Sequence, residues 1–328
     1  MTQFDLLGIG NALVDVVAQS NDGFLTDQGL DKGGMMLIDP DRASQLYAHM
    51  GPAVESSGGS CANTMAGFAS LGGNGAYIGK VHDDVFGTVF RHDMTSIGVS
   101  FTTPAAGDGD PTGRCLVLVT PDAQRTMCTC LGAATALNES DIDADLVQAS
   151  AVTYLEGYLF DPPEAKKAFV RAAELAHAAD RKVAITLSDS FCVERHRDEF
   201  RALVEQHIDI LFANEAEILS LYQVDKFDDA LQAVRGHCEI ACLTRSEKGS
   251  VILSGDELHV VDAEPASKII DSTGAGDQYA AGFLYGYAKG RDLATAGQMG
   301  SIAAAEIISH YGARPEVSLA KLVQEKIG

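Results

Sequence analysis

The sequence predicts an α/β protein in which helices cover both faces of a mostly parallel sheet and a small β-sheet projects as a lid. Three observations lead to this fold class. Short apolar runs alternate with helical stretches along most of the chain. Two segments, 13–39 and 99–130, lack helical periodicity, and the second contains β-rich runs. The 328 residues, 46% hydrophobic and 21% charged, suit one large domain with an appendage.

The strands of the main sheet are predicted from apolar runs that are continuous rather than alternating. Continuous runs are typical of strands buried on both faces. The predicted strands comprise residues 4–10, 76–81, 151–155, 183–187 and 208–212. The helices predicted between them, several of which follow a Ser, Asp or Asn cap, comprise residues 60–71, 85–97, 163–179, 216–222 and 275–288.

The chain is predicted to enter the small sheet twice. Residues 13–39 and 99–130 are assigned to this β lid, and residues 1–12, 40–98 and 131–328 to the large domain. Because both lid segments leave the large domain and return to it, we expect the lid to cover a cleft. The β-rich runs of the second segment, which flank a Pro-Asp turn, are residues 112–120 and 124–130.

The charge balance argues against some classes of partner. The chain has 24 basic and 46 acidic residues, a net charge of -22, which disfavours nucleic acid or an anionic membrane as the main partner. A phosphate site must therefore be built locally. The seven cysteines lack the spacing of a disulfide framework or zinc site, and no apolar run is long enough to span a membrane. We expect a cytoplasmic protein with a small-molecule substrate, either a monomer or a homodimer.

The motif with the strongest chemical implication is Asp-Ser-Thr-Gly-Ala-Gly-Asp at residues 271–277. The turn formed by Gly274, Ala275 and Gly276 precedes a helix, so free backbone N–H groups and the helix dipole favour an anion there. The carboxylate of Asp277 is suited to accept a proton from an attacking hydroxyl. Base and anion hole in one turn are what phosphoryl transfer requires. An ordinary loop followed by an acidic first helical turn is the alternative explanation.

Two segments near the N-terminus offer groups for a polyhydroxy ligand. Gly58 and Gly59 permit close approach of the backbone, and Asn63 carries both a donor and an acceptor. Asn11 and Asp15 follow the first predicted strand and can bind sugar hydroxyls. A tight turn with a capped helix, and a strand-end turn with a solvated aspartate, explain the same residues without a ligand.

A third segment, Asn214 with Glu217, follows the apolar run 208–212 and opens a predicted helix. Ligands of open α/β sheets bind at the carboxyl ends of strands, where a carboxylate can position hydrated magnesium beside phosphates. Capping of the helix explains these two residues equally well. The run 8–13 is not a dinucleotide-binding fingerprint, because Leu13 replaces the last glycine and no helical pattern follows. The chain also lacks the P-loop motif GxxxxGK[ST].

Together, these motifs resemble those of the ribokinase-like (PfkB) carbohydrate kinases, and within that family the adenosine-kinase-like branch. The matching segments occur in the family's order along nearly the whole chain, at residues 10–15, 58–63, 79, 84–87, 214–217, 244–249 and 271–277. The resemblance implies a three-layer α/β/α domain with a β lid, and the substrate held between them.

The resemblance also implies a role for each matching residue. Asp277 would be the general base, and the N–H groups of Gly274, Ala275 and Gly276 would stabilise transferred charge. The positions expected to bind substrate are Asn11, Leu13, Asp15, Gly58, Gly59 and Asn63. Those expected to bind ATP are Asn214, Thr244, Ser246, Gly249, Gly274 and Gly276.

Two ion sites are implied in the same way. Asn214 and Glu217 would hold Mg²⁺ through water, and Asp271 with Thr273 matches a loop that in many members binds a monovalent cation such as K⁺. The chain departs from the family pattern at Ser246 and His82, where many relatives have glycine.

The predicted activity is transfer of the γ-phosphoryl group of ATP to a primary hydroxyl of a nucleoside, with adenosine favoured. In adenosine-kinase relatives the position of Leu13 contacts the purine, and the segment 154–160, with two tyrosines and Phe160, could supply an aromatic surface opposite. These residues could equally belong to the core. One alternative is a PfkB-type kinase acting on a free pentose or ketohexose. Another is a non-catalytic sugar- or nucleoside-binding protein on the same fold.

Overall fold

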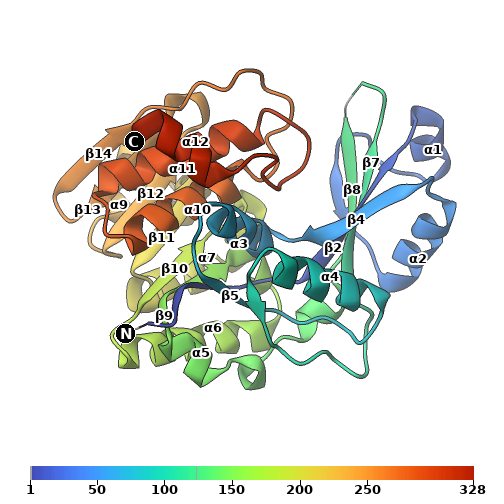
Figure 1. Ribbon diagram of the computed structural model, residues 1–328, viewed down its shortest axis with the longest axis horizontal. Coiled ribbons are helices and arrows are strands. Elements are labelled where there is room, and N and C mark those ends of the chain that lie inside the picture. The colour runs from blue at the N-terminus through green and yellow to red at the C-terminus, as the bar shows by residue number, and fades with distance from the viewer. Residues whose placement is uncertain (1, 123) are drawn as a thin grey trace.

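The computed structural model describes residues 2–122 and 124–328. Residues 1 and 123, which the predicted domain ranges include, lie outside the described residues. Two sheets organise this part of the chain: a large sheet flanked by helices, and a small sheet that projects from it on the right of Figure 1. The predicted fold class is confirmed.

The large sheet contains nine strands within the described residues, in the order β14-β13-β12-β11-β10-β9-β1-β5-β6. Neighbouring strands from β12 to β6 are parallel, whereas β13 and β14 are antiparallel at one edge. All five predicted core strands are present. The bounds are β1 Phe4–Ile9, β5 Gly75–Ile78, β6 Ser100–Phe101, β9 Ser150–Glu156, β10 Lys182–Thr186, β11 Ile210–Asn214, β12 Ile240–Thr244, β13 Ser250–Ser254 and β14 Glu257–Val261.

Helices cover both faces of this sheet because alternate side chains of its strands point to opposite sides. In β1, Leu7 and Ile9 belong to the core cluster that contains buried residues of α5 to α9, whereas Leu6 belongs to the cluster that contains buried residues of α3, α4, α10 and α11. The result is a three-layer α/β/α domain (Figure 1). Its helices are α3 Ser60–Ser70, α4 Val85–Ser96, α5 Ala144–Gln148, α6 Pro163–Ala178, α7 Ser190–His207, α8 Glu215–Tyr222, α9 Phe227–Val234, α10 Ala275–Ala288, α11 Leu293–Ile307 and α12 Leu319–Ile327.

The small sheet has the strand order β3-β8-β7-β2-β4. Successive side chains of its strands point to opposite faces of the sheet. Val14 and Val16 of β2 pack with Leu25 and Leu46 of the covering helices, whereas the intervening residues of β2 face the large domain. The β-rich runs predicted at 112–120 and 124–130 are strands β7 and β8. The elements are β2 Leu13–Gln19, α1 Asp22–Asp27, β3 Met35–Leu37, α2 Pro40–His49, β4 Ala53–Gly58, β7 Gly113–Val119 and β8 Arg125–Cys130.

The structure corrects the predicted domain boundaries. Residues 40–98 are assigned to the large domain by the prediction, but β4 pairs with β2 in the small sheet and α2 packs on that sheet. Residues 99–130 are assigned to the lid, but β6 pairs with β5 of the large sheet. The sequence of β4, Ala-Val-Glu-Ser-Ser-Gly, has few apolar residues, so this edge strand gives little hydrophobic signal.

Asp84 joins the two parts of the molecule. Its carboxylate caps α4 by accepting a hydrogen bond from the Gly87 N–H at 2.8 Å, and it also accepts one from the Thr112 N–H at 2.9 Å, just before β7. The start of β7 is therefore anchored to the large domain. Among the helices of residues 2–122 and 124–328, none is long and apolar enough to cross a membrane.

Candidate active site

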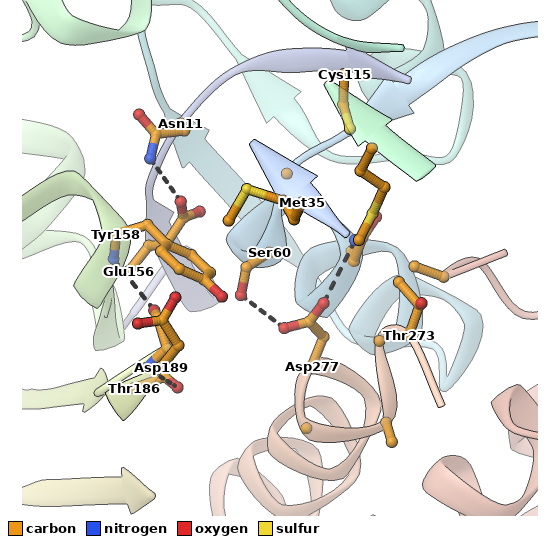
Figure 2. A pocket seen from close by; sticks show the side chains of 18 of the residues that line it. Asn11, Met35, Ser60, Cys115, Glu156, Tyr158, Thr186, Asp189, Thr273 and Asp277 are labelled. Atoms are coloured by element: carbon orange, nitrogen blue, oxygen red, sulfur yellow. Dashed lines mark hydrogen bonds between the residues drawn. The ribbon is translucent and has the colours of Figure 1, made fainter. Parts of the chain in front are cut away.

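A cavity of about 780 Å³ lies between the small sheet and the carboxyl ends of the large sheet's parallel strands. Figure 2 shows side chains from both parts of the molecule converging on it. Most residues predicted from the sequence to form a site line this cavity. They are Asn11, Leu13, Asp15, Gly59, Asn63, Asn214, Glu217, Thr244, Thr273, Gly274, Ala275, Gly276 and Asp277.

The predicted anion-binding turn opens α10. Gly274 adopts a left-handed conformation with φ 81°, which favours glycine, and α10 has no side-chain cap. A Cβ on Gly276 would meet no protein atom within 4 Å, so a ligand can approach this part of the backbone closely. The Ala275 N–H, in contrast with the prediction, already donates to the Ser272 carbonyl at 3.2 Å. The Gly276 and Asp277 N–H groups belong to the first helical turn, which lacks intrahelical acceptors for them.

Asp277 is held at the cavity by two side chains of α3. Its carboxylate accepts hydrogen bonds from Ser60 Oγ at 2.6 Å and Asn63 Nδ2 at 3.3 Å (Figure 2). Burial raises the pKa of Asp277 to about 6, against the opposing effect of these bonds and of Arg314. The group is therefore mostly ionised at neutral pH and able to accept a proton. Ser60 was not predicted individually, although it lies within the segment 58–63.

Glu156, at the end of β9, organises the neighbouring side of the cavity. One carboxylate oxygen accepts from Asn11 Nδ2 and the other from the Cys61 N–H, both at 2.8 Å. Burial raises the pKa of Glu156 to about 7. Asn11 is thus fixed in orientation by a carboxylate that the sequence did not single out. Asp15 of β2 also lines the cavity, and burial raises the pKa of Asp15 to about 6.

Of the two predicted glycines, only Gly59 lines the cavity. Gly58 does not line the cavity; a Cβ on it would lie 2.3 Å from the Asp15 carboxylate. Gly59 does line it, with φ 92°, and a Cβ there would lie 2.3 Å from the Asn11 carbonyl oxygen. Both glycines therefore allow β4 and α3 to pack closely against β2 and the chain before it.

Asn214 and Glu217 form a capping box at the start of α8. Asn214 Oδ1 accepts from the Glu217 N–H, and the Asn214 N–H donates to Glu217 Oε2, both at 2.9 Å. Burial raises the pKa of Glu217 to about 7. The capping explanation is thus correct for these residues, and both also face the cavity. Among the described residues, no group of three or more His, Cys, Asp or Glu side chains is arranged to hold a metal ion by itself.

Ser246 and Gly249 do not line the cavity, unlike Thr244. Gly249 has φ 79°, and a Cβ there would lie 2.0 Å from the Val261 carbonyl oxygen. The turn between β12 and β13 thus requires glycine for packing against β14. Their predicted contact with ATP has no counterpart in the lining of this cavity.

Asp271 and Thr273 do not form a free cation site. One Asp271 oxygen accepts from the Thr273 N–H and hydroxyl, at 3.1 and 2.8 Å. The other accepts from the Gly312 N–H and forms an ion pair with Arg125 of β8 at 2.5 Å. A guanidinium from the small sheet therefore already neutralises this carboxylate.

The small sheet supplies an apolar wall to the cavity. Cavity-facing side chains alternate along its strands with side chains that pack under α1 and α2. Opposite this wall, Tyr158 lines the cavity, and Phe191 is 70% exposed at its edge. Of the three aromatic residues predicted at 154–160, Tyr158 therefore lines the cavity, whereas Tyr154 and Phe160 belong to the buried core. The members of this apolar wall are Leu13, Val17, Met35, Leu37, Val117 and Met127.

Comparison with known proteins gives consistent matches. Residues 32–319 match the model of the pfkB family of carbohydrate kinases. The chain is 28% identical to an adenosine kinase from Saccharomyces cerevisiae, over 94% of this chain and 95% of the yeast protein. The structure of an adenosine kinase from Sinorhizobium meliloti is 49% identical, with a TM-score of 0.91 and 99% of both chains covered. That of a probable sugar kinase from Rhizobium etli is 48% identical, with a TM-score of 0.92 and the same coverage.

Proposed function

The chain belongs to the pfkB family of carbohydrate kinases, and we propose that it transfers the γ-phosphoryl group of ATP to the 5′-hydroxyl of a nucleoside, adenosine in the first place. Family membership makes it a phosphotransferase with an alcohol acceptor, and its homologues imply ATP as donor. The choice of acceptor and the roles of individual residues are our proposal.

The position of Asp277 carries this proposal. Its carboxylate faces the cavity, is oriented by Ser60 and Asn63, and lies one residue from the open backbone of Gly276. A hydroxyl beside this carboxylate can lose its proton while the N-terminus of α10 binds the phosphoryl oxygens. Such an arrangement supports a catalytic protein over a binding protein on the same fold.

The proposed reaction is a direct in-line transfer. The acceptor oxygen forms a bond to the γ-phosphorus as the bond from that phosphorus to the β–γ bridging oxygen breaks, and Asp277 takes the acceptor's proton. The products are the phosphorylated acceptor and ADP. Asn11, Asp15 and Asn63 would orient the acceptor's ring hydroxyls, since they line the same cavity as Asp277 and supply hydrogen-bond donors and acceptors.

The donor side would be formed by Asn214, Thr244 and the α10 turn. Asn214 and Glu217 fit a hydrated Mg²⁺, because carboxylate and amide oxygens suit this ion and the side chains lie together at a strand end. Magnesium, when bound, supplies positive charge to the phosphate oxygens. A net charge of -22 makes this local neutralisation important for binding ATP.

The apolar wall of the small sheet favours a nucleoside over a free sugar. A purine has flat apolar faces that Leu37, Met35 and the Phe191 ring can contact, whereas a free pentose would leave them without a partner. The small sheet would then act as a lid over the base and exclude water from the reaction.

The test is product identification. With Mg-ATP and adenosine, we expect AMP and ADP in equal amounts, and little ADP when the acceptor is omitted. ADP release without a phosphorylated acceptor would indicate an ATPase. If a nucleoside and a non-hydrolysable ATP analogue raise the melting temperature but no acceptor turns over, the protein is a binding protein.

A further inference from the structure

The segment that follows α11 forms a bridge between the catalytic turn and the small sheet. Ala313 packs beneath the turn, since a Cβ on Gly274 would lie 2.8 Å from the Ala313 Cβ. Gln278 Nε2 donates to the Ala313 carbonyl at 3.1 Å and to the Asn63 carbonyl at 2.9 Å. The Gly312 N–H donates to Asp271. This segment is thus fixed to both ends of the motif at 271–277.

Arg314 extends the bridge to β4. Its Nη2 donates to the Ser57 carbonyl at 2.7 Å and to the Ser57 hydroxyl at 3.0 Å. Ser57 is buried, and its N–H donates to Asp93 Oδ2 at 2.7 Å, so the strand is held from two sides. The chain continues from Ser57 through the two glycines to Ser60, which donates to Asp277. The contacts therefore form a closed ring that begins and ends at the catalytic turn.

The charge of Arg314 matters because its surroundings are acidic. The carboxylate of Asp277 interacts electrostatically with Asp15 of β2, Glu156 of β9 and Glu217 of α8. Its hydrogen bonds come from Ser60 and Asn63. Arg314 lowers the pKa of both Asp15 and Asp277, against the stronger effect of burial, and Arg125 also lowers that of Asp15. Loss of the Arg314 charge would therefore make both carboxylates harder to ionise.

We propose that Arg314 is a positioning residue for phosphoryl transfer, which fixes β4 and its two glycines against the Asp277 turn and supplies positive charge to the acidic acceptor site. The inference rests on the proposed function, but it concerns a residue outside the cavity lining and outside the motifs of the sequence.

The test compares Arg314→Gln and Arg314→Lys with Arg91→Gln. Arg91 is a matched control, because its guanidinium also makes two hydrogen bonds, to the carbonyls of Phe101 and Thr103, and it does not line the cavity. For each variant, kcat and KM for adenosine and the pH dependence of kcat/KM are measured. In the wild type, kcat/KM should fall as the pH drops through about 6, because Asp277 must be ionised.

Arg314→Gln should lower kcat by about tenfold or more and move this acidic limb to higher pH, by on the order of one unit. Arg314→Lys should keep the limb near its wild-type pH but lower kcat, because lysine retains the charge without the planar guanidinium. Arg91→Gln should change neither.

The proposal is overturned if the acidic limb of kcat/KM stays at its wild-type pH in Arg314→Gln, or if it moves by the same amount in Arg91→Gln. Should Arg314→Gln fail to fold, wild-type kcat in Arg314→Lys would overturn it. A wild-type protein without kinase activity refutes the proposed function instead, so the two failures are distinguishable.

Discussion

The two walls of the cavity differ both in chemistry and in the way the chain builds them. The wall from the large domain is polar, and its groups lie at strand ends and helix starts: Glu156 ends β9, Asn214 ends β11, and Asp277 lies in the first turn of α10. The wall from the small sheet is largely apolar, apart from Asp15, Arg125 and Thr129, and it is built by alternation along the strands, as in β8, where Met127 faces the cavity and Cys128 faces away.

This difference suggests a division of labour. Groups at strand ends and helix termini are fixed by the main sheet, and in the proposed function they carry the chemistry. Residues along a strand of the small sheet can change without disturbing that framework, and in the proposed function they determine which acceptor fits. Changes in the two walls should therefore have separable kinetic effects.

The largest effect is expected for the polar wall. Asp277→Asn keeps the shape of the side chain but removes the base, so kcat should fall by ~10²–10⁴-fold while adenosine affinity stays close to that of the wild type. Steady-state kinetics and calorimetric binding measure the two quantities. A variant that retains more than about a third of wild-type kcat would remove Asp277 from this role.

The contact between the walls can be broken with Arg125→Gln. Arg125 and Asp271 are 12% and 9% exposed, and removal of one partner leaves the other charge uncompensated. We expect a loss on the order of 3 kcal/mol in the free energy of unfolding, measured by denaturant titration. Lys32→Gln is the matched control, since Lys32 pairs with Asp122 on the surface of the same sheet and should matter little. Equal changes in both variants would contradict a special role for the buried pair.

A smaller effect is expected for Glu217→Gln. Glutamine can keep the capping box but not the negative charge, so the Mg²⁺ concentration for half-maximal rate should rise by about tenfold, with adenosine KM unchanged. Magnesium titration of the initial rate measures this. An unchanged titration would leave Glu217 with its capping role alone.

The smallest effect is expected for the apolar wall. Leu37→Ala should raise adenosine KM by roughly three- to tenfold through lost contact with the base, at nearly constant kcat. Val54→Ala on the same sheet is the control, because Val54 is exposed outside the cavity. A kcat loss larger than the KM change would contradict the separation of the two walls.

The place of Asp277 in the cavity could be predicted because a single short segment contains both the start of a helix and this carboxylate. The core strands could be predicted because parallel strands carry continuous apolar runs. Residues 40–58 could not be assigned correctly, since β4 is a polar edge strand whose pairing with β2 depends on tertiary structure.

The remaining site residues were missed because no local pattern marks them. Glu156 is a lone acid after an apolar strand, and its partners Asn11 and Cys61 lie 145 and 95 residues away. Arg125 and Arg314 act through contacts with distant segments as well. Ser246 and Gly249 lie outside the lining of the cavity for a different reason, because family resemblance identifies their turn but not which of its residues face the cavity.

The most direct test of the account is the comparison of kcat/KM for adenosine, other ribonucleosides, ribose and fructose under identical conditions with Mg-ATP. If the polar wall supports phosphoryl transfer to a primary hydroxyl and the apolar wall selects a base, kcat/KM should be highest for adenosine, lower for the other nucleosides and lowest for the free sugars. A pentose or hexose ahead of every nucleoside would contradict the account, because the apolar wall would then have no base to select.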